Sequence, residues 1–161
     1  MRLLPRVLLL IALAAAGQVH ASTFHGVVSH VTDGDTIWVK RDGRGEAIEI
    51  RIIDLDAPEN CQAFGPQAKR ALAQRVLNRT VTVRTRGTDE YQRTLAQIKY
   101  KGQDVGAWLV REGHAWSGTY QGRRGPYAKL EAEARAAHLG LWANGGAVEP
   151  RHFRRSHGRC V

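Results

Sequence analysis

Short segments in which apolar and polar residues alternate occupy most of the chain between residues 24 and 100, with turn residues between them. In residues 46–53, Ile48, Ile50 and Ile52 share one face of an extended strand, whereas Arg51 lies on the other face. Applied along the chain, this alternation predicts five strands, at residues 24–31, 35–40, 46–53, 80–85 and 93–100. Seventeen glycines and 7% aromatic residues fit a fold with many turns and argue against a coiled coil.

Three helices are expected around these strands. The sequence Phe64-Gly65-Pro66 begins the first, because proline is well tolerated in the first turn of a helix. Asp104 is a natural N-cap for the second, which should end near Gly113, and residues 127–139 form the third. The residues predicted to face the core are Ala68, Leu72 and Val76 in the first helix, Val105, Trp108 and Leu109 in the second, and Leu130, Ala134 and Ala137 in the third.

The order of these elements is typical of a small closed barrel, with one helix after the third strand and the others after the fifth. We therefore predict an α+β protein built on a five-stranded OB-fold barrel with three α-helices. An open antiparallel α+β sheet is the alternative. The 161 residues suffice for a single domain, predicted over residues 22–161, with a basic tail at 150–161.

The first 21 residues have the features of a signal peptide. Arg2 and Arg6 give a basic start, an apolar run covers residues 8–16, and Val19-His20-Ala21 precedes a cleavage site expected after Ala21. A membrane anchor is the alternative, but the apolar run is short for one. The sequence thus predicts a secreted or periplasmic protein that has no membrane attachment after cleavage.

The chain is strongly basic. It carries 24 Lys and Arg against 15 Asp and Glu, a formal net charge of +9. An exported protein with this charge should be attracted to polyanions such as nucleic acids. Charge that serves only solubility is the alternative, and composition by itself does not distinguish the two.

Cys61 and Cys160 are the only cysteines in the sequence. In an oxidising compartment they can form one intramolecular disulfide, which would attach the tail to the loop after Glu59. Two free thiols or an intermolecular bridge are the alternatives. The absence of a C-x-x-C pair argues against a zinc ribbon.

Carboxylates gather near the ends of the predicted strands, at Asp33, Asp35, Asp54, Asp56 and Glu59. Pairing of the second and third predicted strands about Gly43 places Asp35 opposite Arg51. The same register places Ile37 opposite Glu49. The carboxylates at the exit of the third strand can then converge with the Asp35–Arg51 pair. The alternative is that these residues are ordinary turn residues, an interpretation that suits Asp33 and Asp54 best.

Two of these carboxylates, with backbone carbonyls and waters, would form a site of hard oxygen ligands that suits Ca²⁺. Such a site does not suit Zn²⁺, which prefers His and Cys. Arg93, at the start of the fifth strand, could meet the cluster across the barrel. Two arginines, a divalent cation and a carboxylate can cleave a phosphodiester, because they neutralise charge on the phosphate and activate water.

Other features carry less information. His152 and His157 are five residues apart, do not share a helical face, and are predicted to be exposed in the tail. Trp116 and Tyr120, in a glycine-rich segment, are the best candidates to stack on a base. The sequence contains no P-loop, dinucleotide fingerprint or G-x-S-x-G motif.

Five segments resemble the staphylococcal nuclease (thermonuclease) family in their order and spacing, over about residues 24–144. They are V-T-D-G-D-T at 31–36, R-I-I-D-L-D-A-P-E at 51–59, F-G-P-Q-A at 64–68, D-E-Y-Q-R-T-L-A at 89–96 and L-V-R-E-G-H-A at 109–115. No single segment is specific, but all five in order form a strong signal.

The resemblance implies a monomeric, Ca²⁺-dependent endonuclease with an OB-fold barrel. It implies phosphodiester hydrolysis of DNA and RNA, preferably single-stranded or frayed, with little sequence preference and 3′-phosphate products. By position, the implied roles are Ca²⁺ binding for Asp35, Asp56 and the carbonyl of Ala57, a nearby carboxylate for Asp33, phosphate binding for Arg51 and Arg93, action on the attacking water for Glu59, and contact with the nucleotide for Tyr91.

The chain departs from the family pattern at three places. Ala57 replaces the usual threonine, and Gln92 replaces the usual glycine before the arginine. The loop between Glu59 and Phe64 is short and contains Cys61. The exposed tyrosine pair of the best-known member has no clear match. These departures bear on substrate preference, not on the reaction class.

Two other functions remain open at this point. A non-catalytic OB-fold module could bind nucleic acid by charge and stacking. An exported structural or adhesive protein could use the same basic surface. The nuclease is favoured because a module that only binds has no need for the whole set of Asp35, Arg51, Asp56, Glu59 and Arg93.

Overall fold

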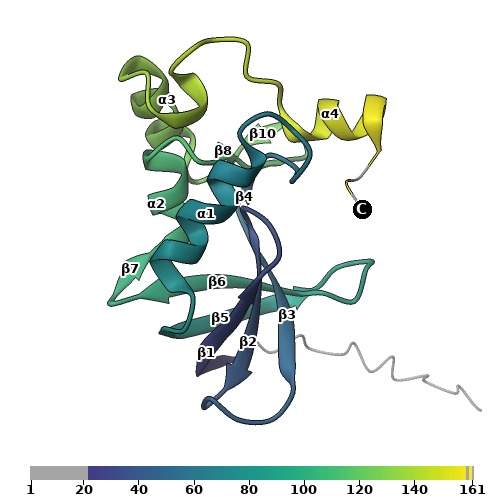
Figure 1. Cartoon of the computed structure of the whole chain (residues 1–161), viewed down its shortest axis with the longest axis vertical. Coiled ribbons are helices and arrows are strands. Elements are labelled where there is room, and N and C mark those ends of the chain that lie inside the picture. Colours follow the sequence, from purple (N-terminus) through teal and green to yellow (C-terminus); the bar gives the residue numbers. More distant parts are fainter. Residues whose placement is uncertain (1–21, 159, 161) are drawn as a thin grey trace, which may run out of the picture.

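The computed structural model describes residues 22–158 and 160, and its centre is a closed barrel (Figure 1). Five main strands are hydrogen-bonded in the order β3-β2-β1-β5-β6, and a parallel pairing of β3 with β6 closes the sheet. These strands are β1 (Thr23–Val31), β2 (Thr36–Arg41), β3 (Ala47–Ile52), β5 (Thr80–Thr88) and β6 (Thr94–Tyr100). The OB-fold prediction is confirmed, and the open-sheet alternative is wrong because β3 and β6 pair.

Short strands and helices complete the structure. The short strands are β4 (Leu55–Asp56), β7 (Gln103–Asp104), β8 (Trp116–Ser117), β9 (Thr119–Tyr120) and β10 (Arg123–Arg124). The helices are α1 (Gly65–Val76), α2 (Val105–Arg111), α3 (Ala128–Ala136), the 3₁₀ helix η1 (Gly140–Trp142) and α4 (Pro150–His157). In Figure 1, α1, α2 and α3 gather at one end of the barrel, and a long connection leads from them to α4.

The predicted alternation of apolar residues is what fills the barrel. Ile37, Ile50 and Ile98 are completely buried, as are Leu72 of α1 and Leu109 of α2. Burial of one such aliphatic side chain stabilises a fold by about 1.5–3 kcal/mol. The inner face of the strands and the apolar stripes of α1 and α2 therefore form one core.

The register of the β2–β3 hairpin differs by one residue from the prediction. Thr36 faces Arg51, and Ile37 faces Ile50 rather than Glu49. Because a shift of one residue moves every side chain to the other face of the sheet, burial of both isoleucines selects this register. Asp35 therefore lies just before the paired segment.

The helix predictions are confirmed in most details. The side chain of Asp104 accepts a hydrogen bond from the backbone N–H of Ala107, as expected of an N-cap. In α3, Ala134 is buried and Leu130 packs against the core. Ala137 was predicted to face the core but is exposed, because the helix ends at Ala136 and the next residue is its C-cap.

The predicted basic tail contains a helix that was not predicted, so the structure has four α-helices where three were expected. Pro150 occupies the first turn of α4, where its missing N–H costs nothing. Phe153 and His157 stack one helical turn apart, with ring centroids separated by 4.3 Å. His152 and His157 are exposed, as predicted.

The predicted signal peptide lies outside the described residues. Within the part of the chain that the structure describes, no helix combines the length and the apolar character needed to cross a membrane.

Candidate active site

Arg51, near the end of β3, is the central cation of the site. Its guanidinium forms ion pairs with Oδ1 of Asp35 and, at 3.1 Å, with Oδ1 of Asp56. Burial lowers the pKa of Arg51, an effect that the nearby carboxylates of Asp56 and Asp33 oppose. An arginine retains its charge in such surroundings, so Arg51 presents a fixed planar cation.

The loop between β1 and β2 presents Asp35 to this cation. The Asp35 carboxylate is almost fully buried, and its Oδ2 accepts a hydrogen bond of 2.7 Å from the backbone N–H of Ala57. Asp33 holds the loop, since its Oδ1 accepts a hydrogen bond of 3.0 Å from the N–H of Asp35. Burial raises the pKa of Asp33, although the charge of Arg51 acts in the opposite direction.

Glu59 lies in the tight loop that joins β4 to α1. Its backbone N–H donates to Oε1 of Gln62, and Gln62, which is buried, donates from Nε2 to the carbonyl of Val148. The first turn of α1 is packed directly against this loop. A Cβ atom at Gly65 would stand 1.9 Å from the carbonyl oxygen of Glu59, so only glycine fits there.

Gly65→Ala is therefore expected to destabilise the protein and to displace Glu59. Backbone atoms cannot yield as a flexible side chain does, and the free energy of unfolding should fall by about 1–3 kcal/mol. Thermal denaturation measures this change. Gln67→Ala, which alters an exposed side chain of the same helical turn, is the matched control. Equal melting temperatures for Gly65→Ala and the wild type would contradict the close packing.

Arg93 reaches the site from the loop before β6, where Asp89 orients it. The Asp89 carboxylate accepts hydrogen bonds from the backbone N–H of Arg93 and, at 2.9 Å, from its Nε. Burial alone would raise the pKa of Asp89, but the hydrogen bonds from Arg93 and Tyr91 lower it overall. Gln92, which replaces the family's glycine, has a φ of 63°. The loop therefore keeps a left-handed turn, at a cost of about 1–2 kcal/mol for a residue with a Cβ.

Arg154, in α4, is a residue of this site that sequence reasoning missed. Its Nη2 lies 2.9 Å from Oδ2 of Asp56, and its Nη1 lies 3.2 Å from Oδ1 of Asp56 and 2.8 Å from Oε1 of Glu59. Burial opposes its charge, but the hydrogen bonds that Arg154 donates to the carboxylates of Asp56 and Glu59 prevail and raise its pKa. The pairing of Cys61 with Cys160, six residues beyond Arg154, was the one signal that could have indicated this position.

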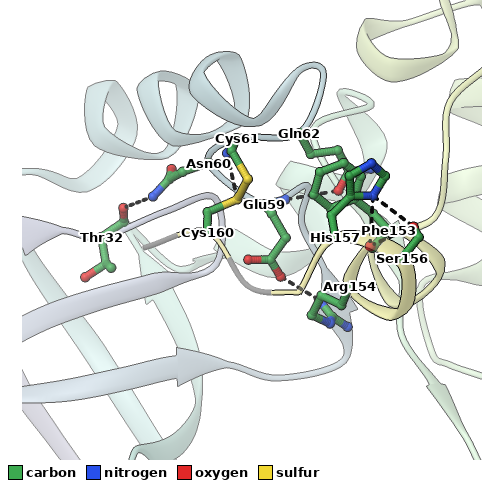
Figure 2. The surroundings of a disulfide bond; sticks show 10 residues. All are labelled: Thr32, Glu59, Asn60, Cys61, Gln62, Phe153, Arg154, Ser156, His157 and Cys160. Carbon is green, nitrogen blue, oxygen red and sulfur yellow. Dashed lines mark hydrogen bonds and ion pairs between the residues drawn. A yellow bond between two sulfur atoms is a disulfide. The ribbon is translucent and has the colours of Figure 1, made fainter.

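Cys61 and Cys160 form an intramolecular disulfide with Cα atoms 5.6 Å apart, so the two alternatives to it do not apply. The backbone N–H of Cys61 also donates to Sγ of Cys160. Figure 2 shows the bond beside Glu59, with the Arg154 side chain extending from α4 toward the same carboxylate. The disulfide thus joins the loop that carries Glu59 to the end of α4.

Most of the predicted polar residues line one pocket of about 230 Å³. Its walls comprise Asp33, Asp35, Arg51, Ala57, Pro58, Glu59, Arg93, Arg154 and Cys160. Asp56 lines the neighbouring hollow, which shares Arg51 and Arg154 with this pocket. The fold therefore brings together residues that are far apart in the sequence.

The aromatic candidates do not behave alike. Tyr120 is 73% exposed and Tyr91 is 51% exposed, and the Arg93 guanidinium lies 5.6 Å from the centroid of the Tyr91 ring. Trp116 is only 4% exposed and packs edge-to-face on Trp142, with centroids 5.1 Å apart. The prediction that Trp116 stacks on a base is wrong, because core packing covers its ring.

The oxygen atoms near Arg51 have the chemistry that Ca²⁺ prefers. The carboxylates of Asp35 and Asp56 both form ion pairs with the guanidinium of Arg51, so the two carboxylates lie close to each other. Ala57 lines the same pocket as Asp35 and Arg51. Among residues 22–158 and 160, no group of three or more His, Cys, Asp or Glu is arranged as a metal site. A calcium ion here would depend on two carboxylates, a carbonyl and waters, which calcium coordination allows.

The chain is similar in sequence to several known proteins. The family model described as staphylococcal nuclease homologue matches residues 49–144. An uncharacterized endonuclease of Haemophilus influenzae is 35% identical over 128 residues, 80% of this chain and 71% of its own length. The protein ParB of Escherichia coli is 39% identical over 141 residues, covering 81% of this chain and 78% of its own. A micrococcal nuclease of Shigella flexneri is 38% identical over 144 residues, covering 83% and 82%.

Proposed function

The chain belongs to the staphylococcal nuclease family, and on that basis we propose that it is a Ca²⁺-dependent endonuclease. Its substrates in this proposal are DNA and RNA, preferably single-stranded or frayed, cut with little sequence preference to leave 3′-phosphates. The observation that supports the proposal best is the single pocket that contains Asp35, Arg51, Glu59 and Arg93. A protein that only binds nucleic acid has no use for a carboxylate among its phosphate-binding arginines.

Each residue has a task that its surroundings suit. Arg51 and Arg93 face the pocket from β3 and from the loop before β6, and their planar forks can bind the phosphate from two directions. Glu59, in the loop between β4 and α1, lines the same pocket, where its carboxylate can orient or deprotonate a water molecule. Asp35, Asp56 and the carbonyl of Ala57 would hold the calcium ion. When bound, that ion would supply Lewis-acid stabilisation of the phosphate charge.

We propose that residues 1–21 direct export, that cleavage follows Ala21, and that the product works as a monomer in the periplasm or outside the cell. The single disulfide accords with an oxidising compartment.

Removal of calcium is expected to abolish activity. Wild-type protein lacking residues 1–21, mixed with heat-denatured DNA, should release acid-soluble nucleotides in the presence of CaCl₂ and release none with excess calcium chelator. The control restores calcium after chelation and should restore release. A folded protein that binds DNA but releases no nucleotides under either condition would favour a non-catalytic OB-fold module.

A further inference from the structure

The C-terminal helix α4 is fastened to the Glu59 loop at both of its ends. Before the helix, Nε2 of Gln62 donates a hydrogen bond of 2.6 Å to the carbonyl of Val148. After the helix, Cys160 is bonded to Cys61. These two ties hold α4 beside the pocket, and Figure 2 shows both Gln62 and the disulfide next to Glu59.

Among the arginines of α4, only Arg154 lines the pocket that contains Glu59, whereas Arg151 lines the neighbouring hollow that contains Asp56. Arg154 has 29% of its side chain exposed and points at Asp56 and Glu59. Arg155, the next residue, is exposed, and Arg151 pairs with Glu149 on the same segment. The contact of Arg154 with the pocket is therefore specific, and not a general effect of a basic helix.

Both contacts engage oxygens that the proposed reaction uses. The fork of Arg154 takes both oxygens of the Asp56 carboxylate, at 2.9 and 3.2 Å. A carboxylate held in this bidentate way cannot offer the same lone pairs to a cation. The additional positive charge also repels a divalent ion nearby. At Glu59, Nη1 of Arg154 donates a hydrogen bond of 2.8 Å to Oε1, one of the two carboxylate oxygens that could act on water.

We propose that Arg154 is a further residue of the cation site, a resident competitor that must leave Asp56 before a divalent cation binds. The Cys61–Cys160 bond, by holding α4 in place, maintains this competition. The inference rests on the proposed function, because it assigns Arg154 a role at the proposed cation site. In this proposal Arg154 sets the calcium concentration that the protein needs for activity, whereas Arg51 and Arg93 act on the phosphate.

Calcium binding measured without nucleic acid tests the proposal. Isothermal titration with CaCl₂ is performed on five proteins: wild type, Arg154→Ala, Arg154→Lys, Arg155→Ala and the double variant Cys61→Ser/Cys160→Ser. Arg154→Ala should bind calcium about five- to tenfold more tightly than the wild type, the effect of removing one partly exposed ion-paired competitor. Arg154→Lys should lie between them, because an ammonium cannot take both oxygens at once.

The remaining two variants separate the effect of the charge of α4 on calcium binding from the effect of its attachment by the disulfide. Arg155→Ala removes the same charge from the same helix and should bind calcium as the wild type does. The double cysteine variant should bind calcium more tightly than the wild type, since α4 loses one tie. The calcium concentration for half-maximal nuclease activity should fall in the same order. Circular dichroism melts identify any variant that is unfolded at the titration temperature. If Arg154→Ala is unfolded, the calcium affinity of Arg154→Lys relative to the wild type tests the proposal instead.

Three outcomes would overturn the inference. Equal calcium affinity in wild type, Arg154→Ala and Arg154→Lys would show that Arg154 does not compete, while leaving the calcium nuclease proposal intact. Unchanged or weaker calcium binding by Arg154→Ala, with lost turnover at saturating calcium, would make Arg154 a substrate ligand instead. No calcium binding by any of the five proteins would reject the calcium site of the proposed function, and the competition with it.

Discussion

Replacing Glu59 with glutamine is expected to lower turnover by about 10²–10⁴-fold, the usual contribution of a positioned general base. Glutamine keeps the size of the side chain and its place beside Arg154, but it cannot accept a proton from water. Binding of single-stranded DNA should stay within a few-fold of the wild type, because the phosphate contacts come from arginines. The measurement pairs single-turnover cleavage of a labelled oligonucleotide with a binding titration in the presence of a calcium chelator.

The control for Glu59 is Glu90→Gln, which removes a carboxylate from an exposed position in the loop before β6. This variant should cleave DNA at the wild-type rate. If Glu59→Gln also cleaves at that rate, the carboxylate takes no part in activating water, and another group in the pocket must do so.

The change of Arg51 to lysine should lower turnover by about 10²–10³-fold, as removal of one preorganised donor to a transition-state anion does. A lysine offers a point charge where the arginine offers a planar fork. It also cannot bridge Asp35 and Asp56 as Arg51 does, so the nearly buried Asp35 carboxylate loses a partner. The free energy of unfolding should therefore fall by about 1–3 kcal/mol.

Arg84→Lys is the matched control, because Arg84 is exposed on β5 and lies outside the pocket. It should leave turnover and the melting temperature unchanged. Arg51→Lys is assayed well below its own melting temperature, so that lost activity reports chemistry and not unfolding. Wild-type turnover in that variant would exclude a fork-like contact between Arg51 and the phosphate.

Prediction from the sequence succeeded where the signal was local. Alternation placed Ile48, Ile50 and Ile52 on one face, and the last two are buried in the barrel. Asp104 was recognised as an N-cap because a short acidic side chain before an apolar helix satisfies free N–H groups. The register of the β2–β3 hairpin was missed by one residue, because the turn alone leaves neighbouring registers open and the packing of Ile37 on Ile50 decides between them.

The same distinction applies to the site residues: those that belong to local motifs were predicted, and those whose role depends on distant contacts were not. The motifs containing Asp35, Arg51 and Arg93 were visible in the sequence, and the structure gathers them in one pocket. Trp116 was misjudged because an aromatic residue in a glycine-rich segment has the same local signature whether it stacks on a ligand or, as here, on Trp142. Arg154 was overlooked because it lies in a segment whose basic composition is typical of a solvated tail.

The sequence by itself determined the five main strands, three of the helices, the basic charge and the presence of the motif residues that line the pocket. These depend on periodicity and on residue types that are close together in the chain. Only the tertiary structure decided that α4 lies against the pocket and that Arg154 meets Asp56 and Glu59 from positions 98 and 95 residues away. Such contacts carry no local signal, because they arise from the closure of the barrel and from the bond between Cys61 and Cys160.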